Sequence, residues 1–173
     1  MLTRLDICGR ICHGCPCGYH THPKKPCRCN PIQVAKYRSK ISGPLLDRID
    51  IHIEIPATKY HELSSDMPAE NSEQIKKRVL KARTIQEKRF QNENVLHNAQ
   101  MNHKQVRKFC TLGKKENELL KLAMTELNFS ARAYDKILKV SRTIADLAES
   151  EQIKTEHLAE AIQYRSMDGD SFF

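Results

Sequence analysis

The sequence SARAYDKILKVSRTIADL, residues 130–147, decides the fold, because its apolar residues recur with the period of an α-helix. On a helical projection, the following side chains fall within one narrow arc: Ala133, Ile137, Val140, Ile144 and Leu147. Such an arc must pack on neighbouring elements. Ser130 can cap the helix, since its hydroxyl can accept a hydrogen bond from an orphan backbone N–H. We therefore predict a helix over residues 131–148 with one face buried.

The same period predicts further helices along the chain. Their expected ranges are 32–41, a single turn at 45–48, 72–92, 104–109, 114–127 and 156–167. Three of them have expected caps, which are Ser72, Asn102 and Thr155. In Ile49–Ile55, isoleucines instead alternate with polar residues and Pro56 follows, which is typical of a half-buried strand. We therefore predict one strand among the helices.

The composition also favours a helical protein over a β-sandwich or a barrel. Hydrophobic residues make up 39% of the chain, aromatic residues only 6% and charged residues 29%. The formal charge of +8 favours polyanionic partners such as nucleic acid or nucleotide phosphates, although solvated lysines and arginines give the same total. No stretch approaches the ~20 apolar residues of a membrane span, and no signal peptide opens the chain. We expect a cytoplasmic protein without a membrane partner.

Six of the seven cysteines lie between Cys8 and Cys29. In a reducing compartment a disulfide framework is not expected. Two Cys-x-Cys pairs suit a closed tetrahedral zinc site that staples a loop, and their four members are Cys15, Cys17, Cys27 and Cys29. Because this spacing is tighter than the usual one, another residue could replace one ligand, and the candidates are Cys8, Cys12, His20 and His22. The alternative is a set of free thiols on a mobile loop.

Three motifs in order resemble the magnesium-chelatase-like competence proteins of bacteria, which are AAA+ ATPases. They are CPCGY (residues 15–19), SGPLLDRIDIHIE (42–54) and the helix sequence at 130–147. The resemblance implies a mainly α chain. A helical AAA+ lid domain would follow a cysteine-rich loop and a remnant of the α/β ATPase core, a short helix plus a strand. The expected divisions are 1–58 for the distal core with its cysteine loop, 59–92 for a connector with a long charged helix, and 93–173 for the lid.

The resemblance also assigns roles to two arginines. Arg48 resembles the arginine finger that reaches a neighbouring subunit's nucleotide site and stabilises charge on the transferred phosphoryl group. The alternative is an ion pair of Arg48 with Asp47 or Asp50. Arg132 resembles the sensor-2 arginine, which contacts the γ-phosphate in its own subunit. Arg142 points elsewhere on the same helix, so we expect it to be structural and paired with Asp146.

Several parts of such an ATPase are missing from the sequence. The chain has no Gly-x-x-x-x-Gly-Lys-Ser/Thr loop (Walker A) and no apolar strand ending in Asp-Glu (Walker B) to hold magnesium. His13-Gly14 stands where the family has the Asn-Pro that carries sensor 1. The chain is therefore predicted not to hydrolyse ATP alone, and ATP and magnesium are expected only in the complete family protein.

Two classes of function remain open at this stage. The first is the distal part of a DNA-processing motor of natural transformation that works as a homo-oligomeric ring, a hexamer. The second is a stand-alone zinc-stapled module that binds nucleic acid through basic residues, namely Lys24, Lys25, Arg28, Lys36, Arg38 and Lys40. An inactive truncated remnant is a third interpretation.

Overall fold

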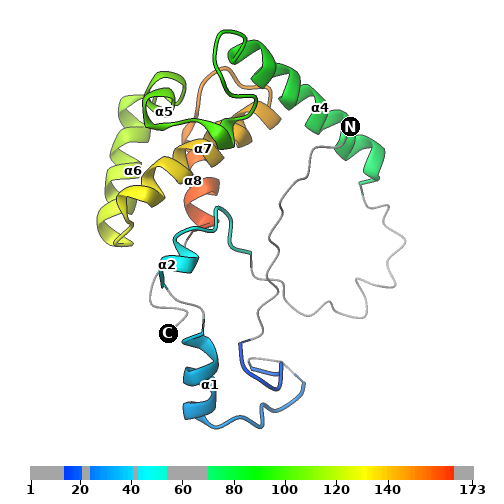
Figure 1. The fold of residues 1–173 in the computed structure, drawn as a ribbon, viewed down its shortest axis with the longest axis vertical. Helices are drawn as coiled ribbons and strands as arrows, with labels where there is room; N and C mark the ends of the chain where they lie inside the picture. Colours follow the sequence, from blue (N-terminus) through cyan, green and yellow to red (C-terminus); the bar gives the residue numbers. More distant parts are fainter. Residues whose placement is uncertain (1–13, 21–23, 41–42, 54–69, 166–173) are drawn as a thin grey trace. The chain divides into compact units, whose positions relative to one another are not determined.

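The computed structural model describes residues 14–20, 24–40, 43–53 and 70–165 (Figure 1). The chain divides into two compact units, Met1–Ser42 and Gly43–Phe172, which we call the cysteine unit and the helical unit. No helix among the described residues is long and apolar enough to cross a membrane.

The described part of the cysteine unit consists of a cysteine-rich loop and helix α1, Pro31–Arg38. A reciprocal capping box starts α1: the Asn30 side chain accepts the backbone N–H of Gln33, and the Gln33 side chain accepts that of Asn30. Arg38 Nε donates to the carbonyl of Gly14 at 3.2 Å and so ties the helix to the loop. Because α1 buries no residue, its order depends on these polar contacts and on the loop.

The helical unit is built around α7, Ala131–Leu147. The other elements are α2 Gly43–Leu46, α4 Ser72–Arg89, the 3₁₀ turn η1 Asn98–Gln100, α5 His103–Phe109, α6 Lys114–Glu126 and α8 Thr155–Gln163. Helices α4, α5, α8 and the turn η1 all contact α7, and α6 packs on α8 (Figure 1). The expected helices are thus confirmed, with ends shifted by a few residues.

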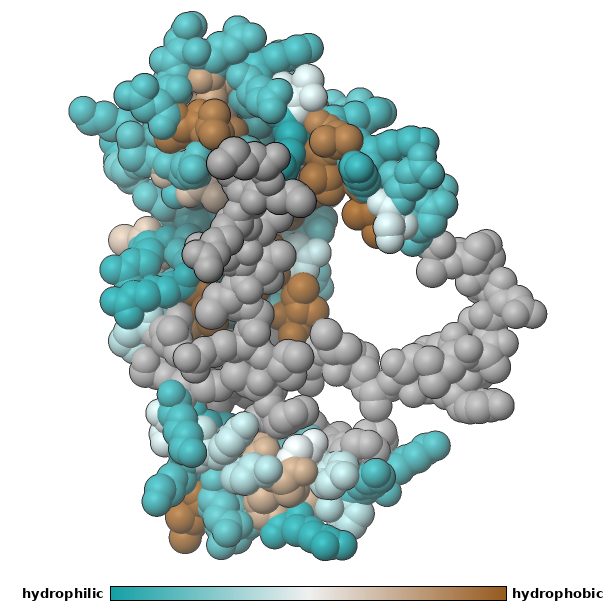
Figure 2. Space-filling view, turned by 45° about the vertical axis from the view of Figure 1, so that its right-hand side comes forward, coloured by the Kyte–Doolittle hydropathy of each residue, from teal (hydrophilic) through white to brown (hydrophobic). Residues whose placement is uncertain are grey.

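The core of the helical unit is apolar and is drawn from almost every helix. Its buried members are Phe90, Met101, Val106, Cys110, Leu120, Phe129, Ala133, Ile137, Leu138, Ala145, Ile153, Leu158 and Ala161. The rings of Phe90 and Phe109 meet edge to face with centroids 5.3 Å apart. The visible face of this unit is mostly hydrophilic, with small apolar patches (Figure 2). Burial of the apolar side chains therefore holds the helices together.

Local signals at the helix starts explain the shifts. Ser130 and Asn102 cap α7 and α5 as predicted, each accepting a backbone N–H three residues on. The predictions for Ser72 and Thr155 are wrong, because each is the first helical residue. Asn71 caps α4 instead, since its side chain forms a closed capping box with Gln74.

Helices α6 and α7 both end in a Schellman motif without glycine. The left-handed residues are Asn128 at φ 48° and Glu149 at φ 53°. After α7, the Ser150 N–H bonds to the Ala145 carbonyl at 2.8 Å, and after α6 the Phe129 N–H bonds to that of Met124 at 3.2 Å. These turns satisfy carbonyls that the helices leave open.

The buried face of α7 includes a charged cluster that the apolar arc did not predict. Asp146 is fully buried and accepts hydrogen bonds from both Nη atoms of Arg89, from Asn98 at 2.8 Å and from Arg142 Nε at 3.1 Å. The predicted pairing of Arg142 with Asp146 is thereby confirmed. Arg142 also donates to the carbonyls of Ser150 and Glu151, so one carboxylate organises α4, η1 and the turn after α7.

The predicted strand Ile49–Ile55 is wrong for residues 49–53, which follow a turn at 47–48 and are irregular apart from a bend at Asp50, while residues 54 and 55 lie outside the described residues. A strand needs a hydrogen-bonding neighbour, and the described residues contain no second strand. The N–H of His52 instead donates to the carbonyl of Tyr164, near the end of α8, at 2.8 Å. The side chains of Ile51 and Ile53 are exposed, so the alternating isoleucines do not form a buried sheet face over these residues.

Replacing Asp146 with alanine should lower the free energy of unfolding by about 3–5 kcal/mol, because Arg89 and Arg142 would be left as buried cations without their carboxylate. Urea unfolding followed by circular dichroism measures the change. Lys81→Ala is the matched control: it removes an exposed α4 ion pair with Glu149 and should cost less than about 1 kcal/mol. Equal losses in the two variants would contradict the importance of the buried carboxylate.

Candidate functional site: a cysteine cluster and the segment around Arg48

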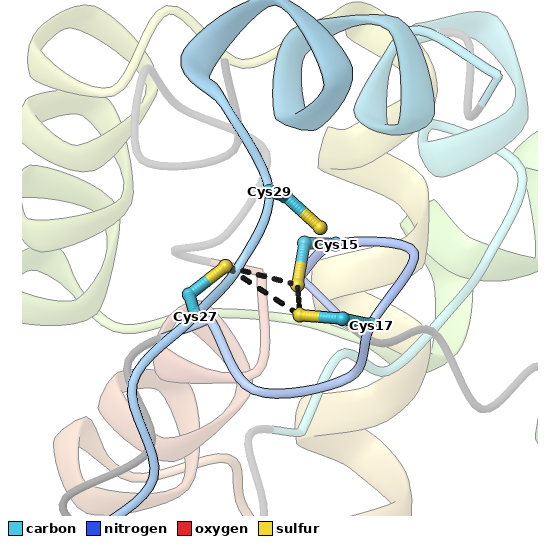
Figure 3. A group of neighbouring side chains, drawn as sticks. All are labelled: Cys15, Cys17, Cys27 and Cys29. Atoms are coloured by element: carbon cyan, nitrogen blue, oxygen red, sulfur yellow. Dashed lines mark hydrogen bonds between the residues drawn. The ribbon is translucent and has the colours of Figure 1, made fainter.

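The four predicted zinc ligands converge on one point in the cysteine unit. The Sγ atoms of Cys15, Cys17, Cys27 and Cys29 all lie within 4.8 Å of one another and point inward (Figure 3). The Sγ atoms of Cys15 and Cys17 are 3.3 Å apart, and the Sγ atom of Cys27 lies 3.6 Å from each of them. A turn closed by the Gly18 N–H on the Cys15 carbonyl brings the first pair together, with Gly18 at φ 77°.

This arrangement fits a tetrahedral metal site. Zinc–sulfur bonds of about 2.3 Å place the sulfurs of a tetrahedral site about 3.8 Å apart, close to the distances between these thiols. Four sulfur ligands leave no position for a reacting water molecule, so the chemistry of the donor set is structural. Although one residue separates the cysteines of each pair, the two pairs still bring their four Sγ atoms together.

The protonation of the cluster is uneven. Backbone N–H groups of Tyr19 and Arg28 donate to the Cys17 sulfur and lower the pKa of its thiol to about 6. At Cys29, a hydrogen bond from the backbone N–H of Cys17 lowers the pKa of the thiol. Burial and the neighbouring sulfurs outweigh this bond and raise the pKa to about 12. Four thiolates repel one another at this distance, and a bound cation would remove that cost.

The alternative ligands are not part of this cluster as described. Among residues 14–20 and 24–40, the group that could hold a metal ion consists of the four cysteines alone, without His20. Cys8, Cys12 and His22 lie outside the described residues. Of the basic residues considered for nucleic acid, Lys25 lies over the Tyr19 ring at 5.1 Å and Lys40 over the Tyr37 ring at 5.7 Å.

In the helical unit, residues 43–53, which we call the 43–53 segment, contact α7 through Asp47. Its carboxylate accepts the Ser130 hydroxyl at 2.7 Å and the Arg132 guanidinium at 3.0 Å. Arg165 Nη2 lies 3.7 Å away from the same carboxylate. Burial would raise the pKa of Asp47, but Ser130 and Arg132 outweigh it and hold the pKa below its ordinary value.

Two further cations bind the backbone of this segment. Lys136 of α7 donates to the carbonyl of Arg48 and forms an ion pair with Asp50. Arg165, which follows α8 and is fully buried, donates to the carbonyl of Ile49 at 2.6 Å. The segment is therefore joined to both α7 and the end of α8.

The structure brings Arg48 and Arg132, the two predicted functional arginines, into the same region. The side chain of Arg48 is exposed, and the described residues offer its guanidinium no ion-pair partner. Neither Asp47 nor Asp50, its expected alternative partners, pairs with it, because they bind other cations. Arg132, by contrast, forms an ion pair with Asp47. Arg132 lies in the first turn of α7, where the helix dipole disfavours a cation, and the carboxylate of Asp47 offsets this cost.

Sequence reasoning missed Lys136 and Arg165. Lys136 lies one helical turn after Arg132 on α7, so its placement beside the 43–53 segment was accessible from helical spacing. Arg165 lies two residues after Gln163, the last residue of α8, and nothing in the local sequence indicates that it is buried.

Two models of known families match this sequence. A model described as "Magnesium chelatase, subunit ChlI C-terminal" matches residues 69–165, and one described as "Magnesium chelatase, subunit ChlI" matches residues 11–63. The first covers the helices from α4 to α8 and more than half of the chain. The chain therefore belongs to the magnesium chelatase ChlI family, which confirms the resemblance found in its motifs.

Curated relatives are longer than this chain. "Competence protein ComM" of Haemophilus influenzae is 41% identical over 153 residues, which cover 88% of this chain and 29% of the relative. "Uncharacterized protein YifB" of Escherichia coli is 40% identical over 142 residues, covering 82% and 27%. An uncharacterized protein of Mycobacterium tuberculosis is 28% identical over 153 residues, covering 87% and 29%. The chain thus spans less than a third of each relative.

Because the Asp47 pKa is lower in the folded chain, the unfolded chain binds more protons in acid, and stability rises with pH. The contribution of Asp47 should be complete above its ordinary pKa of 3.8 and lost as pH falls through the lower folded value. Asp47→Asn should therefore lower the free energy of unfolding at pH 7, by under about 1 kcal/mol since Arg132 is half exposed, and by less at pH 3. Urea unfolding at both pH values tests this; an equal difference at both would contradict it.

Proposed function

We propose that the chain provides the arginine finger and the sensor-2 part of a magnesium-chelatase-like AAA+ ATPase that processes DNA during competence. Arg48 acts in trans on a nucleotide held by a neighbouring subunit of a ring, a hexamer, and Arg132 contacts the phosphate of a nucleotide in its own subunit. In this proposal residues 1–58 complete the ATPase core, 59–92 connect, and 93–173 form the lid. The name of the Haemophilus relative supports the competence role.

The exposed, unpaired state of the Arg48 guanidinium among the described residues is the observation that carries this proposal. A finger must keep its guanidinium available while its backbone is fixed, because stabilisation of a transferring phosphoryl group depends on position. The surroundings favour an anion: the cations Arg48, Arg132, Lys136 and Arg165 outnumber the carboxylates Asp47 and Asp50 by two. A phosphate would find an excess of positive charge beside Arg48.

The contact of Arg132 with Asp47 is compatible with a sensor role. Ion pairs with this much exposure contribute little, about 0–1 kcal/mol, and 56% of the Arg132 side chain is exposed. A nucleotide phosphate, with more charge and more acceptor oxygens, can therefore compete with Asp47 for the guanidinium. Such a change of partner is a way for Arg132 to distinguish ATP from ADP.

ATP hydrolysis requires parts that the sequence does not contain. The phosphate-binding loop and the magnesium-binding acidic residues have no counterpart in the 173 residues. Since positioning and magnesium supply most of the catalysis of phosphoryl transfer, the active site would be assembled with a complete subunit. Arg48 needs only a neighbour's site, whereas Arg132 needs a nucleotide bound by its own subunit.

We also propose that the four clustered cysteines bind structural zinc. The convergence of their Sγ atoms and their soft sulfur donors support zinc over magnesium or calcium, which prefer oxygen ligands. Because α1 buries no side chain, the metal would fix the loop to which Arg38 attaches this helix.

The finger role predicts rescue of a defective ring. A complete family subunit, such as the Haemophilus relative, is prepared with its own finger arginine changed to alanine, and magnesium-dependent ATP hydrolysis is measured with added chain. The wild-type chain should raise the rate at least about tenfold, because fingers contribute of order 10³–10⁵ in rate. The chain alone should not hydrolyse ATP.

Arg48→Ala should abolish this rescue, while the control Arg107→Ala, which removes an exposed arginine on α5, should leave it unchanged. Equal rescue by the wild-type and Arg48→Ala chains would refute the finger role. Hydrolysis by the chain alone that Arg132→Ala abolishes would refute the need for a complete subunit.

The zinc proposal predicts about one zinc ion per purified chain, measured by elemental mass spectrometry. Cys27→Ser should remove most of this metal and speed amide hydrogen exchange in α1. Cys110→Ser is the matched control, because Cys110 lies buried in the core of the helical unit and should leave the zinc content unchanged. A wild-type chain that remains free of metal in the presence of zinc would contradict the proposal.

A further inference from the structure

The backbone around Arg48 is held by cations from two different places in the helical unit. Lys136 of α7 binds the carbonyl of Arg48, and Arg165, after α8, binds the next carbonyl, that of Ile49. Lys136 also pairs with Asp50, and Arg165 approaches Asp47. Both flanks of Arg48 are therefore fixed by charge-assisted bonds.

Burial divides these groups into two kinds. The side chain of Arg165 is fully buried and that of Lys136 is 16% exposed, so water competes little for their bonds to the backbone. The side chain of Arg48 is exposed. The backbone at this point is thus restrained, while the guanidinium that it carries extends into solvent.

The contacts of Lys136 and Arg165 are concentrated on the residues at and next to Arg48. Ile51 and Ile53 are exposed, and between them the N–H of His52 donates to the carbonyl of Tyr164 at 2.8 Å. Simple packing of a loose segment would instead bury its isoleucines, which are the most apolar side chains it has. The cations therefore restrain the backbone at and next to Arg48.

We propose that Lys136 and Arg165 are positioning residues for Arg48, which they hold at the point where a neighbouring subunit's nucleotide receives it. The proposal rests on the finger role of Arg48. Since a displacement of about 1 Å can cost a hundredfold in rate, restraint of the backbone matters as much as the presence of the guanidinium. Because both cations belong to the proposed lid, Lys136 on α7 and Arg165 after α8, a rotation of the lid in one subunit would carry Arg48 with it and change hydrolysis in the next.

Lys136→Met tests this in the intact chain, since it keeps the aliphatic stem and removes the charge. Lys139→Met is the matched control: Lys139 lies on the same helix and bonds a backbone carbonyl elsewhere, that of Ala99, at 3.1 Å. Amide hydrogen exchange is followed at Ile49 and His52, whose N–H groups bond to Leu46 and Tyr164. Exchange at these two amides should become about fivefold faster in Lys136→Met and stay unchanged in Lys139→Met.

The rescue assay provides a second measurement, the maximal rescued rate of ATP hydrolysis, which a purely structural role of Lys136 would leave unchanged. The maximal rescued rate should fall about tenfold or more with Lys136→Met, while the chain concentration giving half of the maximum stays the same. Lys136→Arg, which keeps a cation, should restore much of the rate.

The outcomes separate this proposal from the function on which it rests. Unchanged exchange in Lys136→Met, or faster exchange with an unchanged maximal rate, would overturn the positioning role while leaving the finger role intact. If the wild-type chain rescues no better than Arg48→Ala, the finger role fails, and the positioning role fails with it. Faster exchange together with a reduced rate that Lys136→Arg restores would support the proposal.

Discussion

The buried carboxylate of Asp146 is the constraint on which the rest of the helical unit depends. It binds Arg89 of α4, Asn98 of η1 and Arg142 of its own helix, and Arg142 in turn binds the carbonyls that follow α7. A single anion facing two guanidinium groups is stable in the interior only while all of these donors stay in place. It therefore specifies how α4 and η1 meet α7, in addition to the apolar contacts that hold them there.

The other end of α7 carries the side chains that contact the 43–53 segment. Ser130 and Arg132 bind Asp47, and Lys136, one turn further, binds the carbonyl of Arg48. Because these residues share one rigid helix with Asp146, the orientation that the buried cluster gives to α7 also determines where the segment lies. Stability and proposed function are thus linked through a single element: a charged cluster fixes α7, and α7 binds the segment that carries the exposed Arg48, the proposed finger.

Most of the helical fold could be predicted from periodicity and capping residues, because α6, α7 and α8 carry apolar residues on one face that reveal their ranges. Of the buried cluster, helical spacing predicted only the pair of Arg142 with Asp146, since Arg89, the other partner of Asp146, is distant in sequence. The strand prediction was wrong over residues 49–53 because alternation of apolar and polar residues indicates a sheet face, but a strand forms only beside a hydrogen-bonding neighbour. The clustering of the four cysteines could be predicted from their spacing and from the preference of zinc for sulfur ligands. The burial of Arg165 could not be predicted, because nothing in the neighbouring sequence indicates it.

We propose that a turn held by the lid delivers Arg48 to another subunit's nucleotide. An electron cryomicroscopy structure of the chain assembled with complete family subunits and a non-hydrolysable ATP analogue tests it most directly. The account predicts the Arg48 guanidinium within about 3 Å of the terminal phosphate held by the neighbouring subunit, with Lys136 still on the Arg48 carbonyl. An assembly in which Arg48 contacts no nucleotide, or in which the turn has separated from α7, would contradict it.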